Sequence, residues 1–225
     1  MKKKKIKTNA TFKEYLLSSV ALTFLSILYI VILKTTDVKM IGPKGTSVGL
    51  SSINLYFKNL LGSNMTIYKV TEVFGLIAIA IAGIYALLGL LQLVKRKSIK
   101  EVDKKIISLG ILYALVVIVY VLFEKVIINY RPVLMDGEIE ASFPSSHTML
   151  AICICVSAIL TNKNYIKNKN YLKITNIFIV AIMLVVVIGR FISGVHWFTD
   201  IMGGLIISIT LLNYYLTIDH FLEKK

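Results

Sequence analysis

Residues 73–94 read VFGLIAIAIAGIYALLGLLQLV, a run of 22 residues without a charged side chain. A helix needs about 20 apolar residues to cross the roughly 30 Å hydrocarbon core of a bilayer. Across all 225 residues, 56% are hydrophobic and 17% are charged, whereas about a quarter of the residues in soluble domains are charged. The run therefore predicts a transmembrane helix, in a chain whose composition disfavours a soluble globule.

Five further apolar blocks of this kind follow one another along the chain. Membrane spans are predicted at about residues 15–33, 73–94, 106–128, 147–161, 173–190 and 198–218. The fourth and fifth apolar blocks are short, and they reach spanning length only with the polar residues at their ends. We predict an all-α polytopic membrane protein with six transmembrane helices, folded as a single membrane-embedded domain over residues 1–225.

Basic residues are distributed unevenly between alternate connections. The two termini and the connections at 95–105 and 162–173 hold 18 Lys and Arg residues, against 8 in the other connections. Because cytoplasmic segments carry the excess of basic residues, both termini are predicted to be cytoplasmic. The net charge of +14 then fits contact with anionic headgroups. No nucleic-acid partner is predicted, and the bilayer itself is the expected partner.

The N-terminal segment and the first outward connection raise two further questions. The lysines before the first apolar run resemble a signal peptide, but the length of the run and the missing cleavage site favour a retained helix. In the connection after it, Ile53, Tyr56, Phe57 and Leu60 follow helical spacing. We expect a short interfacial helix on the outer leaflet there, with an irregular loop as the alternative.

The segment GRFISGVHWFTD (189–200) contains the first group of candidate catalytic residues. His196 and Asp200 are four residues apart, so on a helix they share one face. A carboxylate placed there can accept a proton from one imidazole nitrogen and leave the other as a nucleophile. Arg190 has a guanidinium fork that matches phosphate oxygens. Taken singly, these features also fit a structural pair and a membrane-boundary arginine.

The stretch NYRPVLMDGEIEASFPSSHTML contains the second group. Arg131 is expected to end the third span, because Pro132 stops a helix. Ser145 and Ser146 open the fourth span, where free N–H groups and the helix dipole form an anion site. His147, in the first turn, could donate a proton to a leaving oxygen. Ionisable groups at membrane depth indicate function.

Metal ligands are not predicted from this sequence. Cys153 and Cys155 lie two positions apart within a span, on different faces, and are interpreted as small apolar side chains. Asp136, Glu138 and Glu140 are interpreted as a solvated loop. The alternatives for these three acids are a metal site with His147, or repulsion that selects headgroups.

These residues, taken in order, resemble the three-part signature of a known family. The signature consists of Arg131-Pro132, then Pro144-Ser145-Ser146-His147, then Arg190-x5-His196-x3-Asp200. It is similar to that of the phosphatidic acid phosphatase type 2 superfamily, which includes lipid phosphate phosphatases and undecaprenyl-diphosphate phosphatases. The motifs lie in the second half of the chain, and the six-helix outline covers nearly all of it.

The resemblance implies a catalytic role for each motif residue. His196 would form a phosphohistidine, Asp200 would orient it, and His147 would protonate the leaving group and later activate water. The phosphoryl oxygens would be bound by Arg131, Arg190, Ser145 and Ser146. No cofactor or metal is implied, because arginines and a helix terminus stabilise the charge.

The sequence departs from the family pattern at three positions. Glu124 stands where the first motif has a lysine, and Lys125, one residue on, is a candidate phosphate ligand in its place. Ser146 replaces the usual glycine of the second motif, and Gly189 replaces the usual serine before the third-motif arginine.

The function implied is that of a metal-independent phosphatase of the cell membrane, with its active site facing outside. Its substrate would be a lipid phosphate or diphosphate, such as undecaprenyl diphosphate or a phosphatidic-acid-type lipid. Two alternatives stay open: a lipid phosphotransferase with the same site, and a catalytically inactive lipid-binding member. The richness in Lys, Ile and Asn suggests a bacterial source. The oligomeric state is not predicted.

Overall fold

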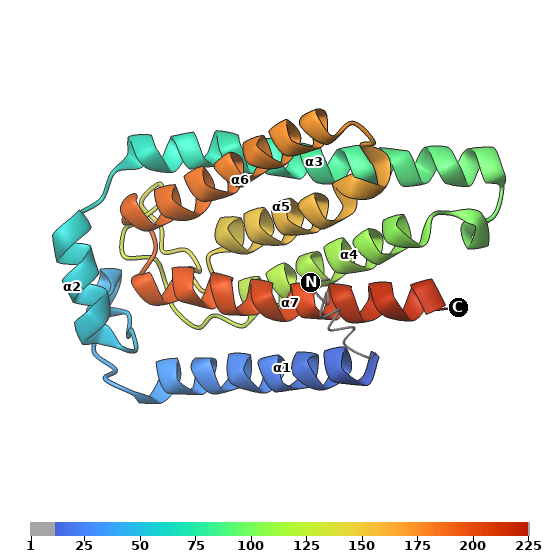
Figure 1. Ribbon diagram of the computed structural model, residues 1–225. Helices are drawn as coiled ribbons and strands as arrows, with labels where there is room; N and C mark the ends of the chain where they lie inside the picture. The colour runs from blue at the N-terminus through green and yellow to red at the C-terminus, as the bar shows by residue number, and fades with distance from the viewer. Residues whose placement is uncertain (1–11, 225) are drawn as a thin grey trace, which may run out of the picture.

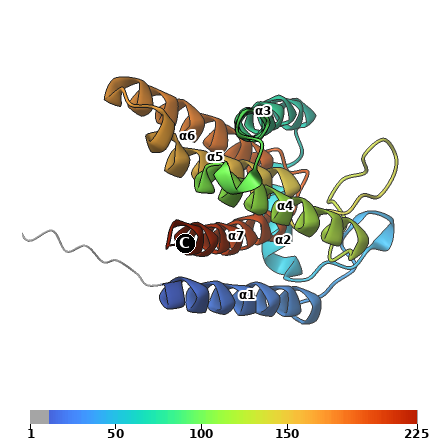
Figure 2. The same ribbon diagram turned by 90° about the vertical axis from the view of Figure 1, so that its right-hand side faces the viewer.

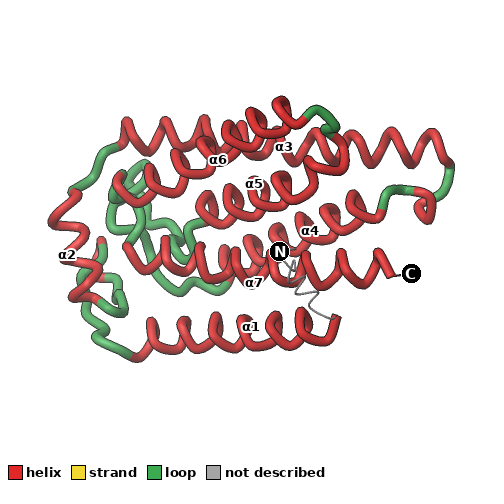
Figure 3. Tube along the Cα trace, viewed as in Figure 1, coloured by secondary structure: helices red, strands yellow, loops and turns green. Residues whose placement is uncertain are grey.

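The computed structural model describes residues 12–224, and this part of the chain folds into helices joined by loops (Figures 1 and 3). The α-helices are α1 (Phe12–Thr35), α2 (Ser51–Leu61), α3 (Met65–Arg96), α4 (Lys104–Lys125), α5 (Ser146–Tyr165), α6 (Lys169–Ile192) and α7 (Phe198–Lys224), with short 3-10 turns at Pro43–Gly45 and Ile99–Glu101. Six of them, all except α2, are long and apolar enough to cross a membrane. The predicted all-α fold with six spans is confirmed; the basic segment at residues 1–11 lies outside the described residues.

Successive long helices run in opposite directions, so α1 begins and α7 ends at the same end of the bundle (Figure 1). α5 and α7 form its interior: 61% and 56% of their apolar stretches are buried, against 11% for α1 and 17% for α3. α1 lies at the edge, against α7 (Figure 2). Cys153 and Cys155 of α5 are both buried free thiols in the core. The multi-pass architecture thus places two central helices behind the candidate site.

Hydrogen bonds link α1 to α7 along the length of their contact. Ser19 contacts Thr217 at 3.0 Å, Thr23 contacts Tyr214 at 3.0 Å, and Ser26 contacts Thr210 at 2.9 Å. Apolar burial does not drive helix association within lipid, so polar side chains contribute specific contacts between spans. At the far end of α1, Tyr29 donates to the backbone oxygen of Thr199 and joins α1 to the first turn of α7.

One helix begins well before its predicted span, because a capping side chain and not hydropathy determines where it starts. α3 begins at Met65, eight residues before the predicted span, because the Asn64 side chain accepts a hydrogen bond from the Ile67 N–H and caps the helix. The extra turns bring Tyr68 and Glu72 onto α3. Hydropathy therefore located the apolar part of the helix, and the cap located its start.

The prediction that the third span extends to residue 128 and that Arg131 ends it is wrong. α4 ends at Lys125, so Arg131 and Pro132 lie in the following loop. The two arms of that loop pair with each other: the Ser142 N–H donates to the Asn129 oxygen at 2.9 Å, and the Arg131 N–H donates to the Glu140 oxygen at 3.0 Å. This backbone pairing replaces the helical hydrogen bonds well before the proline.

The short helix predicted between the first two spans is confirmed as α2. One face is exposed, with Tyr56 and Leu60 outward. On the other face, the Phe57 ring stacks on Phe198 with centroids 4.4 Å apart, and buried Asn54 contacts the start of α7. α2 therefore supports the turn between α6 and α7 in addition to presenting an apolar face outward.

Candidate active site

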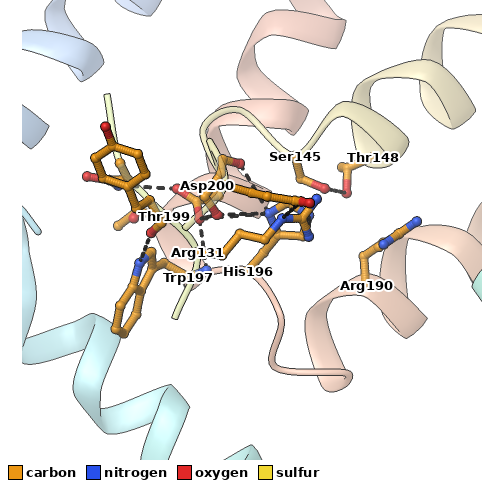
Figure 4. A network of polar contacts seen from close by, with 12 residues as sticks. Arg131, Ser145, Thr148, Arg190, His196, Trp197, Thr199 and Asp200 are labelled. Carbon is orange, nitrogen blue, oxygen red and sulfur yellow. Dashed lines mark hydrogen bonds and ion pairs between the residues drawn. The ribbon is translucent and has the colours of Figure 1, made fainter. Parts of the chain in front are cut away.

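α1 begins and α7 ends at one end of the bundle, and the sequence motifs come together at the opposite end (Figures 1 and 4). Four segments contribute: the loop after α4, the first turn of α5, the last turns of α6 and the start of α7. The predicted residues at this end are Arg131, Ser145, Ser146, His147, Arg190, His196 and Asp200. The fold thus brings together residues that span 70 positions of sequence.

His196 lies in the turn between α6 and α7, and 6% of its surface is exposed. Its Nδ1 is 3.1 Å from the Ser142 backbone oxygen, and its Nε2 is 3.2 Å from Arg131 Nη1 (Figure 4). A carbonyl can only accept and a guanidinium can only donate. Nδ1 therefore carries the proton, and Nε2 presents its lone pair, which is the tautomer that a nucleophile at Nε2 requires.

The surroundings of His196 also favour its neutral form. Burial lowers the pKa of the imidazole well below its usual value of 6.5, and the nearby positive charges of Arg131 and Arg190 lower this pKa further. The hydrogen bond that His196 donates to the Ser142 backbone oxygen opposes this shift but does not reverse it. The side chain is therefore uncharged at neutral pH and retains the lone pair on Nε2.

The Asp200 carboxylate holds His196 indirectly. Its Oδ2 is 3.9 Å from His196 Nδ1, which is too long for a hydrogen bond. The Ser142 hydroxyl bridges the two: it donates to Asp200 Oδ2 and lies 3.1 Å from Nδ1. The i, i+4 spacing predicted a direct hydrogen bond between His196 and Asp200. The Ser142 hydroxyl, which was not among the predicted site residues, connects them instead.

Asp200 has further donors that fix its orientation. The Trp197 N–H donates to Oδ2 at 2.9 Å, and the Asn129 side-chain amide donates to Oδ1 at 3.2 Å. Trp197 itself donates through its indole to the Tyr130 oxygen at 2.7 Å. Asn129 and Ser142 lie on the paired arms of one loop, and no local spacing in the sequence marks them.

Arg190 is completely buried at the end of α6. It pairs with the Glu72 carboxylate of α3, and its guanidinium lies 4.4 Å from the centre of the Tyr68 ring. Its Nε and Nη1 have no hydrogen-bond partner among residues 12–224. A buried charge with unused donors is costly, so these nitrogens are available to an anion. The alternative of a plain membrane-boundary arginine does not fit this burial.

His147 lies in the first turn of α5 and faces α3. Its Nε2 is 3.4 Å from Glu72 Oε1, and a Cβ added at Gly75 would be 2.7 Å from the ring. The glycine therefore permits the close approach of the two helices. The sequence analysis missed Glu72, although a charged residue directly before the uncharged run at 73–94 was a usable signal.

The two serines of the second motif play different parts. Ser145 is buried, and its hydroxyl accepts a hydrogen bond from the Thr148 hydroxyl at 3.0 Å. Its backbone N–H donates to the backbone oxygen of Asp200 at 3.0 Å. Ser146 begins α5 and lines a cavity beside His196. Of the two predicted hydroxyls, the one that replaces the usual glycine is therefore the one that faces the cavity.

The cavity is lined by polar and apolar residues from the end of α4, the loop after it and the start of α5. Its lining includes Tyr120, Glu124, Arg131, Ser142, Ser146 and His196. The position of the family's motif lysine is thus inside the cavity, and here it carries a carboxylate. Lys125, proposed as a substitute for that lysine, is exposed and does not line the cavity.

The acidic loop is only partly the solvated loop that was predicted. Glu140 forms an ion pair with Arg131 Nε at 3.1 Å, whereas Glu138 pairs with exposed Lys44 at 3.4 Å and Asp136 lies exposed in a turn. Within residues 12–224, no three His, Cys, Asp or Glu side chains are grouped so that they could hold a metal ion. Glu140 therefore belongs to the surroundings of Arg131.

Comparison with known proteins connects this geometry to a family. The family model of the PAP2 superfamily matches residues 105–223, which is more than half of the chain. The chain belongs to the PAP2 superfamily. The match begins at α4 and includes all three motifs, whereas α1, α2 and α3 lie outside it. Arg190, which lies within the matched residues, pairs with Glu72 of α3, which lies outside them.

The fold of this PAP2 protein is similar to a solved structure over nearly its whole length. That structure is described as the crystal structure of the first transmembrane PAP2 type phosphatidylglycerolphosphate phosphatase from Bacillus subtilis. The two are 20% identical, with a TM-score of 0.61 over 92% of this chain and 96% of the other. A search of curated proteins gives no match. The similarity extends the shared fold beyond the family match, to the first helices.

Proposed function

We propose that this PAP2 protein is an integral membrane lipid phosphatase that acts through a phosphohistidine at His196. The observation that supports it best is the buried, neutral imidazole, with Nδ1 held by Ser142 and Nε2 directed at Arg131. A structural histidine would need no lone pair facing an arginine at a cavity wall. A nucleophile for an anionic phosphoryl group needs both features.

The first chemical step is transfer of the phosphoryl group to the protein. The lone pair on His196 Nε2 forms a bond to phosphorus, and the bond from phosphorus to the lipid oxygen breaks. Arg131, Arg190 and the N-terminus of α5 stabilise the negative charge on the phosphoryl oxygens. His147 gives its proton to the departing lipid oxygen. No metal is required, because the positive charge comes from these groups.

The second step returns the protein to its starting state. His147, now without its proton, accepts one from a water molecule, and the water oxygen forms a bond to phosphorus. The bond between phosphorus and His196 breaks, which releases inorganic phosphate and restores the Nε2 lone pair. Asp200, acting through Ser142, keeps the ring in one orientation through both steps.

The site is proposed to face the outside of the cell and to take lipid substrates. The excess of basic residues at the opposite end of the bundle supports this orientation. Substrates proposed are undecaprenyl diphosphate and phosphatidic-acid-type lipids. Phosphatidylglycerol phosphate joins them, because the similar solved structure carries that name. In each, the phosphate group belongs to the polar headgroup of the lipid, and the candidate site lies at one end of the helix bundle.

The test is phosphate release by the purified protein in detergent micelles that contain EDTA, with these three lipids offered separately. We expect release from at least one, and an acid-labile, base-stable phosphohistidine after rapid quenching. His196→Gln should abolish both. His220→Gln is the matched control, because His220 lies near the end of α7, at the opposite end of the bundle. Full activity of the His196→Gln variant would contradict the proposal.

A further inference from the structure

The face of α3 toward the site carries two residues that the family match does not include. Tyr68 and Glu72 are one helical turn apart on α3. The Tyr68 ring lies 4.4 Å from the Arg190 guanidinium and 5.8 Å from that of Arg131. α3 therefore places an aromatic ring near both arginines and a negative charge against Arg190.

A single oxygen of Glu72 contacts two of the groups that the proposed mechanism needs. Oε1 pairs with Arg190 Nη2 and lies 3.4 Å from His147 Nε2. The mechanism requires Arg190 to hold a phosphoryl oxygen and His147 to reach the leaving oxygen. The carboxylate therefore occupies donors at Arg190 Nη2 and His147 Nε2 that a substrate oxygen would otherwise use, and it competes with the substrate for them.

The Glu72 contact leaves two donors of Arg190 unused. Arg190 Nε and Nη1 are buried and have no partner while Glu72 is bound. The Glu72 side chain is 39% exposed, whereas that of Arg190 is fully buried. The carboxylate is thus the part of the pair that can move, and an anion with more oxygens can satisfy more of the donors.

The surrounding membrane makes this competition significant. Phosphodiester lipids are the bulk of a bilayer, and each phosphodiester group carries one negative charge. An open pair of arginines would attract them as well as the substrate. A tethered carboxylate competes at an effective concentration in the millimolar range or above. Exchanging one single charge for another gains little, whereas a doubly charged phosphomonoester gains additional Coulomb energy and additional hydrogen bonds.

We propose that Glu72 is a specificity-determining residue that excludes phosphodiester headgroups from the phosphoryl site and yields to terminal phosphomonoesters. It rejects the wrong ligand by charge, a form of discrimination that does not depend on the lipid tail. The inference rests on the proposed function, because it assumes that Arg190 and His147 receive the phosphoryl group.

The test compares two soluble anions by calorimetric titration of the full chain in detergent, at about pH 8, where inorganic phosphate is doubly charged. Dimethyl phosphate serves as the singly charged phosphodiester. The wild-type protein should prefer inorganic phosphate. In Glu72→Gln, which keeps a hydrogen-bonding side chain, dimethyl phosphate should bind about tenfold tighter or more, and the preference should fall by a similar factor. An unchanged preference, or loss of both ligands by the folded variant, would overturn the inference.

Two further variants keep the test decisive. Glu138→Gln removes an exposed carboxylate that pairs with Lys44, and it should leave the preference unchanged. Glu72→Asp retains the charge but shortens its reach, so its preference should lie between those of wild type and Glu72→Gln. This second variant also decides the matter if Glu72→Gln does not fold; a wild-type preference in it would then count against the inference.

An activity assay separates the inference from the proposed function. With phosphatidic acid as substrate, adding phosphatidylglycerol to the micelles at constant substrate fraction should inhibit Glu72→Gln more strongly than wild type. Equal inhibition would count against Glu72 as the discriminating residue. If the wild-type protein hydrolyses no lipid phosphate at all, the proposed function fails, while the anion titrations still decide the role of Glu72.

Discussion

The two histidines of the site are held in contrasting ways. His196 is buried, and a chain of donors and acceptors through Ser142 fixes both its tautomer and its orientation. His147 Nε2 lies 3.4 Å from the partly exposed carboxylate of Glu72, and its Nδ1 has no hydrogen-bond partner in the described part of the chain. The contrast fits the proposed roles, because a nucleophile benefits from an environment fixed in advance, whereas the proposed proton donor must be free to meet the leaving lipid oxygen.

The contrast extends to the elements that supply each side. The His196 side is built from the loop after α4 and the start of α7, both within the family match. The His147 side is completed by α3, which lies outside that match. The His196 side thus lies wholly within the family match, whereas the His147 side also includes a helix outside it. Substitutions on the two sides should therefore have different kinetic effects.

The largest effect is expected for Asp200→Asn. The neutral amide cannot stabilise the charge that develops on His196, and its NH₂ group can turn toward the donors that Asp200 accepts. We expect kcat to fall by about 10³- to 10⁴-fold, measured as phosphate release from the preferred lipid. Asp136→Asn, in the exposed loop, is the control and should stay near wild type. A decrease in kcat of less than about tenfold would show that the fixed environment of His196 does not matter in this way.

Ser142→Ala should have an intermediate effect. It removes the hydroxyl bridge but keeps the backbone oxygen at His196 Nδ1. The loss of a hydrogen bond to a charged group, about 1.5 to 3 kcal/mol, corresponds to about a 10- to 150-fold decrease in kcat. Adding the substitution to Asp200→Asn should cost much less than it does alone, because the bridge then has no carboxylate to join. Fully additive losses would show that Ser142 and Asp200 act separately.

The pH dependence of stability should report the lowered pKa of His196. In the unfolded chain the imidazole takes up a proton near its usual pKa of 6.5, whereas in the native state it stays neutral to lower pH. The unfolded state then binds more protons, so stability falls as the pH decreases through this range. The melting temperature in detergent should fall less in His196→Gln than in wild type between about pH 7.5 and about pH 5.5. His220→Gln should behave like wild type.

The smallest effect is expected from the support that α2 provides. Asn54 accepts a hydrogen bond from the Thr199 N–H at 3.1 Å and donates to the Thr199 hydroxyl at 3.0 Å. Asn54→Ala leaves a buried N–H without a partner, at a cost of about 1 to 3 kcal/mol in stability, with a several-fold decrease in kcat. Thermal unfolding in detergent measures the first. Asn59→Ala, on the exposed face, should change stability by less than about 0.5 kcal/mol.

Much of the site could be predicted because its residues lie in short motifs at helix ends. Arg190, His196 and Asp200 fall within 11 residues, and their order and depth were sufficient to group them. Ser142 and Asn129 could not be found this way, since neither has a distinctive neighbour. Arg131 was grouped correctly but was placed at the end of a helix, because Pro132 was taken as the residue that stops it. The helix ends earlier, and the backbone pairing within the following loop has no signal in the local sequence.

The sequence alone determined the six spans, their order and the polar residues at one end, because hydropathy and helix length act locally along the chain. The tertiary structure decided which of those residues meet. The Ser142 bridge joins a loop to α7, and the Glu72 contact joins α3 to α5 and α6. Such contacts depend on how separate helices pack, and local spacing carries no information about the distance between two helices.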